Sequence, residues 1–335
     1  MKKPTMRDIA KAVGTSAVTV SNAMAGKPGM SEQLRADILR KAEEMGYEYP
    51  KADRMPQAPL PDIGILVPDR YFETESFYSG MYRQLVRKLT EKGHFGLLEI
   101  LSREDEKAGR LPNLIRSGRA GGLIMLGETE KTYYRAAAQA GVPVVYLDFY
   151  DDQANADAVV GDNAYGTYRL TSHLIRRGHT KIGFVGNRLA TGSIMDRYLG
   201  FYRAMLTHGL PAREEWILED RDEEGRTRRP ELPREMPTAL VCNCDLTARM
   251  MIDLLREKGF RVPEDVSVTG FDDYPPAAEN ETGLSTYRVD TEAMIDMAVK
   301  MITERCRGTD KPFARMVISG QPVYRGSEIS LNGEE

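Results

Sequence analysis

Seven short apolar runs, alternating with segments of helical periodicity, limit the fold of this chain more than any other feature. Each run is almost continuously apolar, which is typical of strands buried on both faces of a parallel sheet. The predicted strands cover residues 63–67, 95–100, 121–126, 142–147, 181–186, 238–242 and 266–271. The predicted helices cover residues 78–92, 104–116, 131–139, 164–177, 194–207 and 246–258. This alternation predicts a doubly wound α/β body, and residues 62–335 are long enough for two such lobes.

The stretch Thr5–Met24, TMRDIAKAVGTSAVTVSNAM, has the pattern of two short helices joined by a tight turn. The first helix is predicted at residues 6–12, and the second begins at Ala17. Gly14 suits the turn because it adopts left-handed backbone conformations at little cost, and Ser16 can cap the second helix. The outward side chains of the second helix are short, as a DNA groove requires: Ala17, Val18, Thr19, Ser21 and Asn22. A DNA-binding helix-turn-helix is therefore predicted, with a helical hairpin of no nucleic-acid role as the alternative.

A third helix and a linker follow. Ser31 is a suitable N-cap for a helix at residues 32–45, which carries an apolar stripe at helical spacing. Residues 1–48 are therefore predicted to form a three-helix headpiece. Residues 49–61, YPKADRMPQAPLP, contain four prolines, which prevent a long helix, so this segment is predicted to be a linker or hinge.

Charge is distributed unevenly along the chain. Residues 1–60 contain ten Lys and Arg against seven Asp and Glu, a net charge of +3, whereas the whole chain carries −4. A basic N-terminal part on an acidic body suits a protein that contacts DNA phosphates with one end. The sequence has no run of 18 apolar residues and no apolar signal core near its start, so we expect a cytoplasmic protein without membrane contact.

Polar and aromatic residues follow the predicted strands, at the edge where open α/β sheets bind ligands. They include Tyr71, Phe72, Phe77, Tyr78, Glu128, Asp148, Ser193 and Asp272. Arg197, near the start of a predicted helix, adds fixed hydrogen-bond donors. Carboxylates accept hydrogen bonds from neighbouring hydroxyls and aromatic rings cover the apolar face of a sugar, so a small carbohydrate is the predicted ligand. One arginine among several acids favours a neutral polyol over a phosphate, although each acid by itself fits a solvated loop or a helix cap equally well.

Motifs of catalysis are missing from the sequence. It contains no GxGxxG after the first predicted strand, no GxxxxGK[ST] and no GxSxG, and its four histidines are far apart. Cys242 and Cys244 have the spacing of half a metal site, but no second Cys or His pair lies at ligand spacing. We therefore expect no enzyme, no cofactor and no bound metal. A sugar-binding protein without a DNA role and an α/β enzyme acting on sugars remain as alternatives.

Eight segments together resemble the lactose-repressor (LacI/GalR) family of bacterial transcription regulators. They are TMRDIAKAVGTSAVTVSNAMAGKPGMS at 5–31, MGY at 45–47, VVYLDF at 144–149, DNAYG at 162–166, LIRRGHTKIGFVG at 174–186, SIMDRYLGF at 193–201, VCNCD at 241–245 and VPEDVSVTGFDD at 262–273. The resemblance implies a homodimer, a near-palindromic DNA operator, and a body similar to periplasmic sugar-binding proteins. We accordingly expect an N-lobe at about residues 62–160 and 288–318, and a C-lobe at about 161–287 and 319–331. A repressor whose operator affinity is controlled allosterically by an effector between the lobes is the expected function.

The same resemblance assigns expected roles to individual residues. Positions that contact bases in the family correspond to Ala17, Val18 and Asn22, and positions near phosphates correspond to Thr5, Ser16, Thr19, Ser21 and Ser31. Asparagine can bind an adenine edge through two hydrogen bonds and Ala or Val can meet a thymine methyl, so we expect A·T preference in each half-site. Effector-contact positions correspond to Asp148, Ser193, Arg197 and Asp272.

Two departures from the family pattern affect these expectations. Family members usually have an asparagine where this chain has Cys244, which removes or alters one contact to a polyol. They also usually carry a short hinge helix with a leucine that enters the minor groove. Here Arg54 keeps a basic position and Met55 supplies an apolar side chain one residue early, whereas Pro56 disfavours the helix.

Overall fold

Two units make up the chain, and each builds its own hydrophobic core. A computed structural model describes residues 4–24, 30–47, 61–72, 77–222, 225–274 and 283–333. The first unit comprises residues 1–60 and the second residues 61–335. Residues 49–60 of the predicted linker lie outside the described residues, as does Glu48 of the predicted headpiece.

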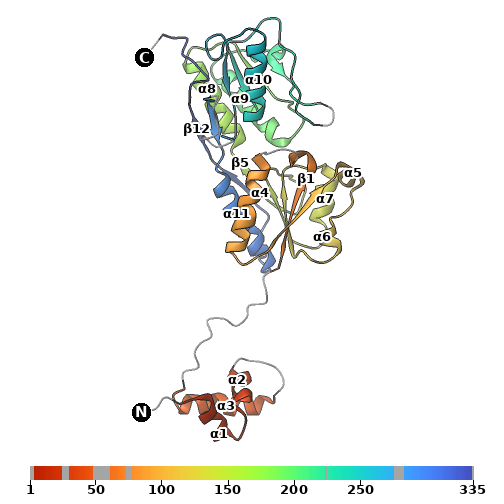
Figure 1. Cartoon of the computed structure of the whole chain (residues 1–335), viewed down its shortest axis with the longest axis vertical. Helices are drawn as coiled ribbons and strands as arrows, with labels where there is room; N and C mark the ends of the chain where they lie inside the picture. The colour runs from red at the N-terminus through yellow and green to blue at the C-terminus, as the bar shows by residue number, and fades with distance from the viewer. Residues whose placement is uncertain are drawn as a thin grey trace. The chain divides into compact units, whose positions relative to one another are not determined.

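The first unit is a three-helix headpiece. Its helices are α1 (Met6–Val13), α2 (Ala17–Met24) and α3 (Glu32–Glu44) (Figure 1). Thr5 caps α1, because the backbone N–H groups of Thr5 and Asp8 each donate to the side chain of the other residue. Gly14 ends α1 with a φ of 73°, the left-handed conformation expected of the turn. The core of the unit consists of Ile9, Ala10, Val20, Ala23, Ile38 and Ala42.

A six-stranded parallel sheet forms the N-lobe of the second unit. Its order is β11-β5-β4-β3-β1-β2. The strands are β1 (Ile63–Pro68), β2 (Gly96–Leu101), β3 (Gly122–Leu126), β4 (Val144–Leu147), β5 (Asp157–Gly161) and β11 (Arg315–Ile318). One face of the sheet packs against α4 (Phe77–Glu91) and α11 (Thr291–Cys306). The other face packs against α6 (Asn113–Arg116) and α7 (Lys131–Ala138), and α5 (Arg103–Ala108) lies beside α7 (Figure 1).

A smaller parallel sheet, of order β7-β6-β8-β9, forms the C-lobe. Its strands are β6 (Ile182–Val185), β7 (Ile217–Leu218), β8 (Ala239–Cys242) and β9 (Ser267–Thr269). Helices α8 (Asn163–Arg176) and α9 (Gly192–Thr207) pack together on one face, and α10 (Asp245–Glu257) covers the other. The antiparallel pair β10 (Thr286–Arg288) and β12 (Gln321–Val323) lies beside this sheet. The predicted doubly wound fold is confirmed, with helices on both faces of each sheet.

The chain passes between the lobes three times, after β5, after β10 and after β11. The sequence prediction omitted β5, β7, β10, β11, β12 and α11. Most of the missed strands are short and less apolar than the seven runs. The prediction of one helix at 104–116 is wrong, because Gly109 adopts a φ of 61° and ends α5, and Pro112 precedes α6.

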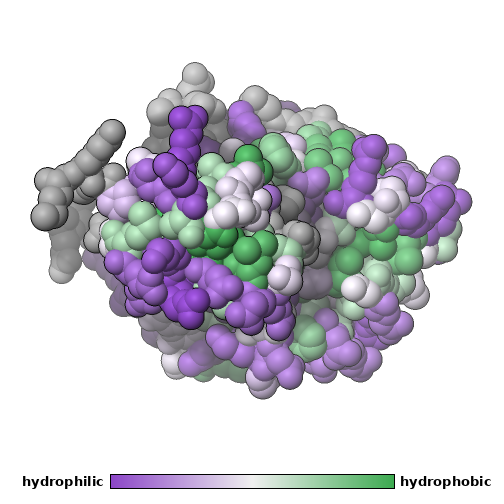
Figure 2. Space-filling view, turned by 90° about the horizontal axis from the view of Figure 1, so that it is seen from below, coloured by the Kyte–Doolittle hydropathy of each residue, from purple (hydrophilic) through white to green (hydrophobic). Residues whose placement is uncertain are grey.

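Exposed apolar side chains occur at scattered positions and on helix α9, which exposes Leu199, Tyr202 and Leu206. Val18 lies in the headpiece, Phe95 precedes β2 and Leu189 precedes α9, and all three side chains are exposed. Figure 2 shows one face of the molecule, on which hydrophilic side chains surround smaller hydrophobic areas. In the described part of the chain, no helix is long and apolar enough to cross a membrane.

The packing of α8 against α9 depends on Gly200. A Cβ atom at this position would lie 2.1 Å from the carbonyl oxygen of Ala164, which is backbone and cannot rotate away. The two helices can therefore approach this closely only because residue 200 has no side chain.

We expect Gly200→Ala to lower the free energy of unfolding of the body by about 1–3 kcal/mol, because the steric overlap exceeds the gain in helix propensity. Urea unfolding followed by Trp216 fluorescence measures this, since Trp216 is the only tryptophan and is buried in the C-lobe. Leu206→Ala, at an exposed position of the same helix, is the matched control and should change stability by less than about 0.5 kcal/mol. Equal stability of the two variants would contradict the packing argument.

Candidate DNA-binding surface and interlobe site

Helix α2 buries one side and exposes the other. Val20 and Ala23 lie in the headpiece core, whereas Val18 is 69% exposed. The remaining predicted DNA contacts of this helix are partly exposed: Ala17, Thr19, Ser21 and Asn22. Arg54 and Met55, which were also predicted to contact DNA, lie outside the described residues. The outward side of α2 therefore presents small and amide side chains to a partner.

Hydroxyl groups mark the starts of the headpiece helices. Ser16 Oγ accepts a hydrogen bond from the Thr19 N–H at 3.0 Å, and the two hydroxyl oxygens are 2.9 Å apart. Ser31 Oγ accepts from the Leu34 N–H at 3.3 Å, and Thr5 caps α1. These hydroxyls thus cap helices, whose N-termini favour anions such as phosphate. Helix capping by itself accounts for hydroxyl side chains at these positions.

Predicted effector residues from both lobes lie at the carboxyl ends of the sheets. Tyr71, Glu128 and Asp148 follow N-lobe strands, whereas Arg197, Cys244 and Asp272 follow C-lobe strands. Direct contacts join the lobes here, because Glu128 Oε2 accepts a hydrogen bond from the Gly192 N–H at 2.7 Å. We use the name interlobe site for the set Tyr71, Tyr78, Glu128, Asp148, Arg197, Arg221, Cys244 and Asp272.

Arg197 is the most extensively bonded residue of the interlobe site. Its guanidinium donates from Nε to Asn163 Oδ1 at 2.8 Å and from Nη1 to the carbonyl oxygen of Asn243 at 2.6 Å. Nη2 lies 3.2 Å from Asp272 Oδ1, and the guanidinium carbon lies 4.0 Å from the centre of the Phe271 ring. These contacts hold the guanidinium in one orientation, as fixed recognition of a ligand requires.

Asp148 and Tyr78 form a buried pair in the N-lobe. The Tyr78 hydroxyl donates to Asp148 Oδ2 at 2.7 Å. Burial raises the pKa of Asp148, while the charge of Arg197 and the bond from Tyr78 oppose that rise. Asp148 also has a φ of 72°, a left-handed conformation that aspartate tolerates better than most residues. The carboxyl is therefore held by backbone and side-chain contacts together.

Glu128 and its neighbours connect α9 to the N-lobe. Burial raises the pKa of Glu128, and the hydrogen bond from Gly192 opposes this change. The Glu128 carbonyl oxygen accepts from Tyr71 Oη at 3.2 Å and from Arg70 Nη2 at 2.8 Å. The Tyr71 ring in turn packs on Tyr78, with 4.6 Å between ring centres. Aromatic rings and carboxyl groups thus lie side by side, a combination typical of carbohydrate sites.

The other three predicted effector residues are Phe72, Phe77 and Ser193. Phe72 packs edge-on against Tyr82, with 5.7 Å between ring centres, and belongs to the N-lobe core. Phe77 packs edge-on against Tyr78 of the interlobe site, with 5.5 Å between ring centres, and against Tyr274 of the C-lobe at 6.4 Å, so it contacts both lobes. Ser193 Oγ lies 3.0 Å from the hydroxyl of its neighbour Thr191, at the start of α9.

Three residues found here were not among the predicted effector contacts. Asn163 and Asn243 hold Arg197, and Arg221 lies beside Cys244, with 4.0 Å between Nη2 and Sγ. Asn163 follows β5 and Arg221 follows β7, and neither strand was predicted. Correct assignment of those two strands would have placed both residues at the carboxyl edge of a sheet.

Two acids of the C-lobe interact near the site. Burial raises the pKa of Asp245 to about 8, and the charge of Asp272 adds to the rise. Burial also raises the pKa of Asp272 to about 7, although Arg197 opposes it. Asp245 accepts hydrogen bonds from the Tyr274 N–H at 2.8 Å and from Thr286 Oγ1 at 2.6 Å. Asp245 therefore positions the residue that meets Phe77 across the lobes.

The cysteines have different surroundings. Cys242 is buried in the C-lobe core, where burial raises the pKa of its thiol far above the usual range. Cys244 is half-buried and its sulfur lies 3.3 Å from Thr247 Oγ1. Among the described residues, no group of three or more His, Cys, Asp or Glu side chains could hold a metal ion.

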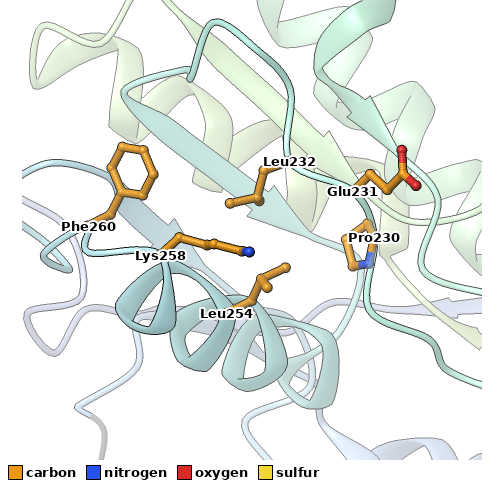
Figure 3. A pocket seen from close by; sticks show the side chains of 6 residues that line it. All are labelled: Pro230, Glu231, Leu232, Leu254, Lys258 and Phe260. Carbon is orange, nitrogen blue, oxygen red and sulfur yellow. The ribbon is translucent and has the colours of Figure 1, made fainter.

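A separate cavity of about 550 Å³ lies at the C-terminal half of α10. It is lined by Pro230, Glu231, Leu232, Leu254, Lys258 and Phe260, several of which point into it in Figure 3. None of the predicted DNA-binding or effector residues lines this cavity, so it plays no part in either candidate site.

The chain thus combines a helix-turn-helix headpiece with a two-lobed α/β body of the kind that binds small ligands. The family model "Bacterial regulatory proteins, lacI family" matches residues 5–49, and "Periplasmic binding protein-like domain" matches residues 171–328. The chain is 30% identical over 345 residues to "HTH-type transcriptional regulator MalR" of Streptomyces coelicolor, and the match covers 98% of each chain. The chain belongs to the LacI family, and it is a DNA-binding transcriptional regulator.

Two solved structures have the same fold over nearly the whole chain. One is "transcriptional regulator CelR-cellobiose complex", with a TM-score of 0.67, 23% identity, and coverage of 97% of this chain and 99% of that one. The other is the lac repressor dimer bound to operator and the anti-inducer ONPF, with a TM-score of 0.67, 20% identity, and coverage of 98% and 100%.

We expect the stability of the body to fall as pH rises from about 5 to about 8. In that range the unfolded Asp245 is ionised while the folded carboxyl, with its pKa of about 8, still binds a proton. One such group contributes a slope of up to about 1.4 kcal/mol per pH unit. Asp245→Asn should therefore flatten the pH profile of urea unfolding, measured by Trp216 fluorescence.

Asp253→Asn is the matched control, because Asp253 is an exposed acid on the same helix. Its pH profile should follow that of the wild type. Parallel profiles for the wild type and Asp245→Asn would show that residue 245 does not bind the extra proton.

Proposed function

We propose that this regulator is a homodimeric repressor whose operator affinity is controlled by a carbohydrate-like effector bound at the interlobe site. The observation that carries the proposal is the convergence of hydrogen-bonding groups from both lobes around Arg197, Asp148 and Asp272. Such a site responds to a ligand by changing the relation between the lobes.

The headpiece supports specific DNA binding through α2. Val18, with its exposed apolar side chain, and Asn22 can read base edges from the major groove. The capped N-termini of the helices supply backbone N–H groups that favour phosphates. Thr5, Ser16, Thr19, Ser21 and Ser31 are proposed to line the DNA backbone, and Arg54 and Met55 are proposed to contact the minor groove.

The chemistry of the interlobe site supports a polyhydroxylated effector. Carboxyl groups of Asp148 and Asp272 can accept hydrogen bonds from hydroxyls, Arg197 can donate them, and the rings of Tyr71 and Tyr78 can pack against an apolar sugar face. The structurally similar CelR is described as a cellobiose complex, which agrees with a carbohydrate ligand.

Dimerisation follows from the small size of the headpiece. One headpiece covers too little DNA for specific affinity, and two can occupy half-sites about one helical turn apart. The similar lac repressor is described as a dimer bound to operator. In our proposal, effector binding changes the angle between the lobes and so shifts the linkers of the dimer relative to each other. This shift changes how well the two headpieces fit the half-sites. Sedimentation showing a monomer in the presence of operator would contradict this account.

We expect Asn22→Ala to weaken operator binding about 5- to 150-fold at constant salt, the range for loss of a two-bond base contact. Gel shifts with the protein's own upstream DNA across a salt series measure it. Binding to unrelated DNA, which depends on phosphate contacts, should be nearly unchanged. Gln33→Ala, at an exposed position of α3, is the control and should bind operator like the wild type. Equal loss on both DNAs would contradict base recognition by Asn22.

We expect Asp148→Asn to weaken effector binding by roughly 10- to 100-fold, because a hydrogen bond to a charged group is lost. Asparagine also tolerates the left-handed backbone at this position, so folding should be preserved. The measurement is the concentration of sugar that alters a gel shift, tested with mono- and disaccharides. Asp152→Asn, an exposed acid nearby, should respond like the wild type. If Asp148→Asn responds to the sugar like the wild type, the effector does not bind at Asp148.

A further inference from the structure

Arg221 gives the interlobe site a second cation, which the sequence analysis did not count. It follows β7 at the carboxyl edge of the C-lobe sheet, and its side chain is 18% exposed. Its charge lowers the pKa of both Tyr71 in the N-lobe and Asp272 in the C-lobe, although burial of each group dominates and raises its pKa. Arg221 therefore acts on groups of both lobes.

Neutral groups supply most of the contacts of this guanidinium. Nη1 donates to the hydroxyl of Thr227, and Nη2 lies 4.0 Å from the sulfur of Cys244. Burial raises the pKa of the Cys244 thiol, so the thiol is uncharged near neutral pH. Neither neighbour neutralises Arg221.

The acid beside Arg221 is already bonded to other groups. Within the described ranges, the carboxylate paired with Arg221 is that of Asp220, whose Oδ2 lies 3.6 Å from Nε, beyond hydrogen-bond distance. Asp220 Oδ2 accepts from Asn243 Nδ2 and from Thr247 Oγ1, each at 2.6 Å, and Oδ1 accepts from the Asn187 N–H at 3.0 Å. Both oxygens of this carboxylate are therefore engaged by neutral donors, and its ion pair with Arg221 is longer than a hydrogen bond.

Other arginines of similar exposure are paired more closely. Each donates to a carboxylate oxygen: Arg70 to Glu106 at 2.6 Å, and Arg305 to Asp157 at 2.7 Å. Burying a guanidinium without such a partner has an unfavourable desolvation free energy. An anion that reaches the guanidinium offsets it through charge-assisted hydrogen bonds.

We propose that the effector is a sugar acid, a uronic or aldonic acid, and that Arg221 binds its carboxylate while Asp148, Arg197 and Asp272 bind its hydroxyls. This inference rests on the proposed function. The planar fork of a single arginine matches a carboxylate through two parallel hydrogen bonds, whereas a doubly charged phosphate calls for more than one free cation. Arg70 and Arg197 have carboxylate oxygens at 2.6 and 3.2 Å, closer than the 3.6 Å between Arg221 and Asp220. The expectation of a neutral polyol, which counted Arg197 alone, is revised accordingly.

The test compares acids with their neutral parents on the full-length protein by calorimetry and by release from operator DNA. The pairs are glucuronate and glucose, galacturonate and galactose, and gluconate and glucitol, with glucose 6-phosphate as a phosphate probe. In the wild type, at least one acid should bind about tenfold or more tightly than its neutral partner. Arg221→Gln should remove that preference, so that the acid binds no more tightly than its neutral partner, and Arg221→Lys should keep part of it.

Arg228→Gln is the matched control, because Arg228 is exposed on the same loop and its loss changes net charge equally. It should retain the preference for the acid. A neutral sugar binding as tightly as its acid, a preference that survives Arg221→Gln, or selective binding of the phosphate would each overturn the assignment. If a neutral sugar binds and Asp148→Asn weakens it, the proposed function stands while this inference fails. If no compound of the set binds or affects the operator complex, both fail.

Discussion

The interlobe site depends on the buried guanidinium of Arg197. A charge removed from water is tolerated only when hydrogen bonds and a counter-ion replace the lost hydration. Here Asn163 at the start of α8, the carbonyl of Asn243 after β8 and the carboxylate of Asp272 after β9 provide them. One side chain therefore joins three segments of the C-lobe, and the ring of Phe271 packs against its face.

Two opposing effects act on the pKa of the acids around this guanidinium. Burial raises the pKa of Asp148 and of Asp272, while Arg197 favours their charged forms. Both residues also have positive φ, 72° and 110°, so backbone conformation contributes to their placement. Glu128 extends the network to the N-lobe through its bond to the N–H of Gly192. Polar groups under such constraint have little freedom to rearrange, which favours specific recognition over adaptable binding.

Much of the fold was predictable because strands buried on both faces of a parallel sheet appear in the sequence as continuous apolar runs. The headpiece helices were predictable from capping residues and spacing, and Gly14 marks their turn. Short strands such as β7, with two residues, carry too little pattern to be recognised. The helix predicted at 104–116 failed because helical periodicity outweighed the breaks at Gly109 and Pro112. Asp290 caps α11 and its apolar spacing is regular, so that helix could have been found.

The sequence by itself determined the family, the alternation of strands and helices, and the candidate residues at strand ends, because these depend on local patterns and motifs. Tertiary structure decided which of those candidates meet. It joined Asp148 to Tyr78, took Phe72 into the N-lobe core, and brought Arg221 to Cys244. These pairings join residues far apart in the chain, and the strength of a charge depends on which groups surround it and how deeply it is buried. Neither quantity can be read from the order of residues.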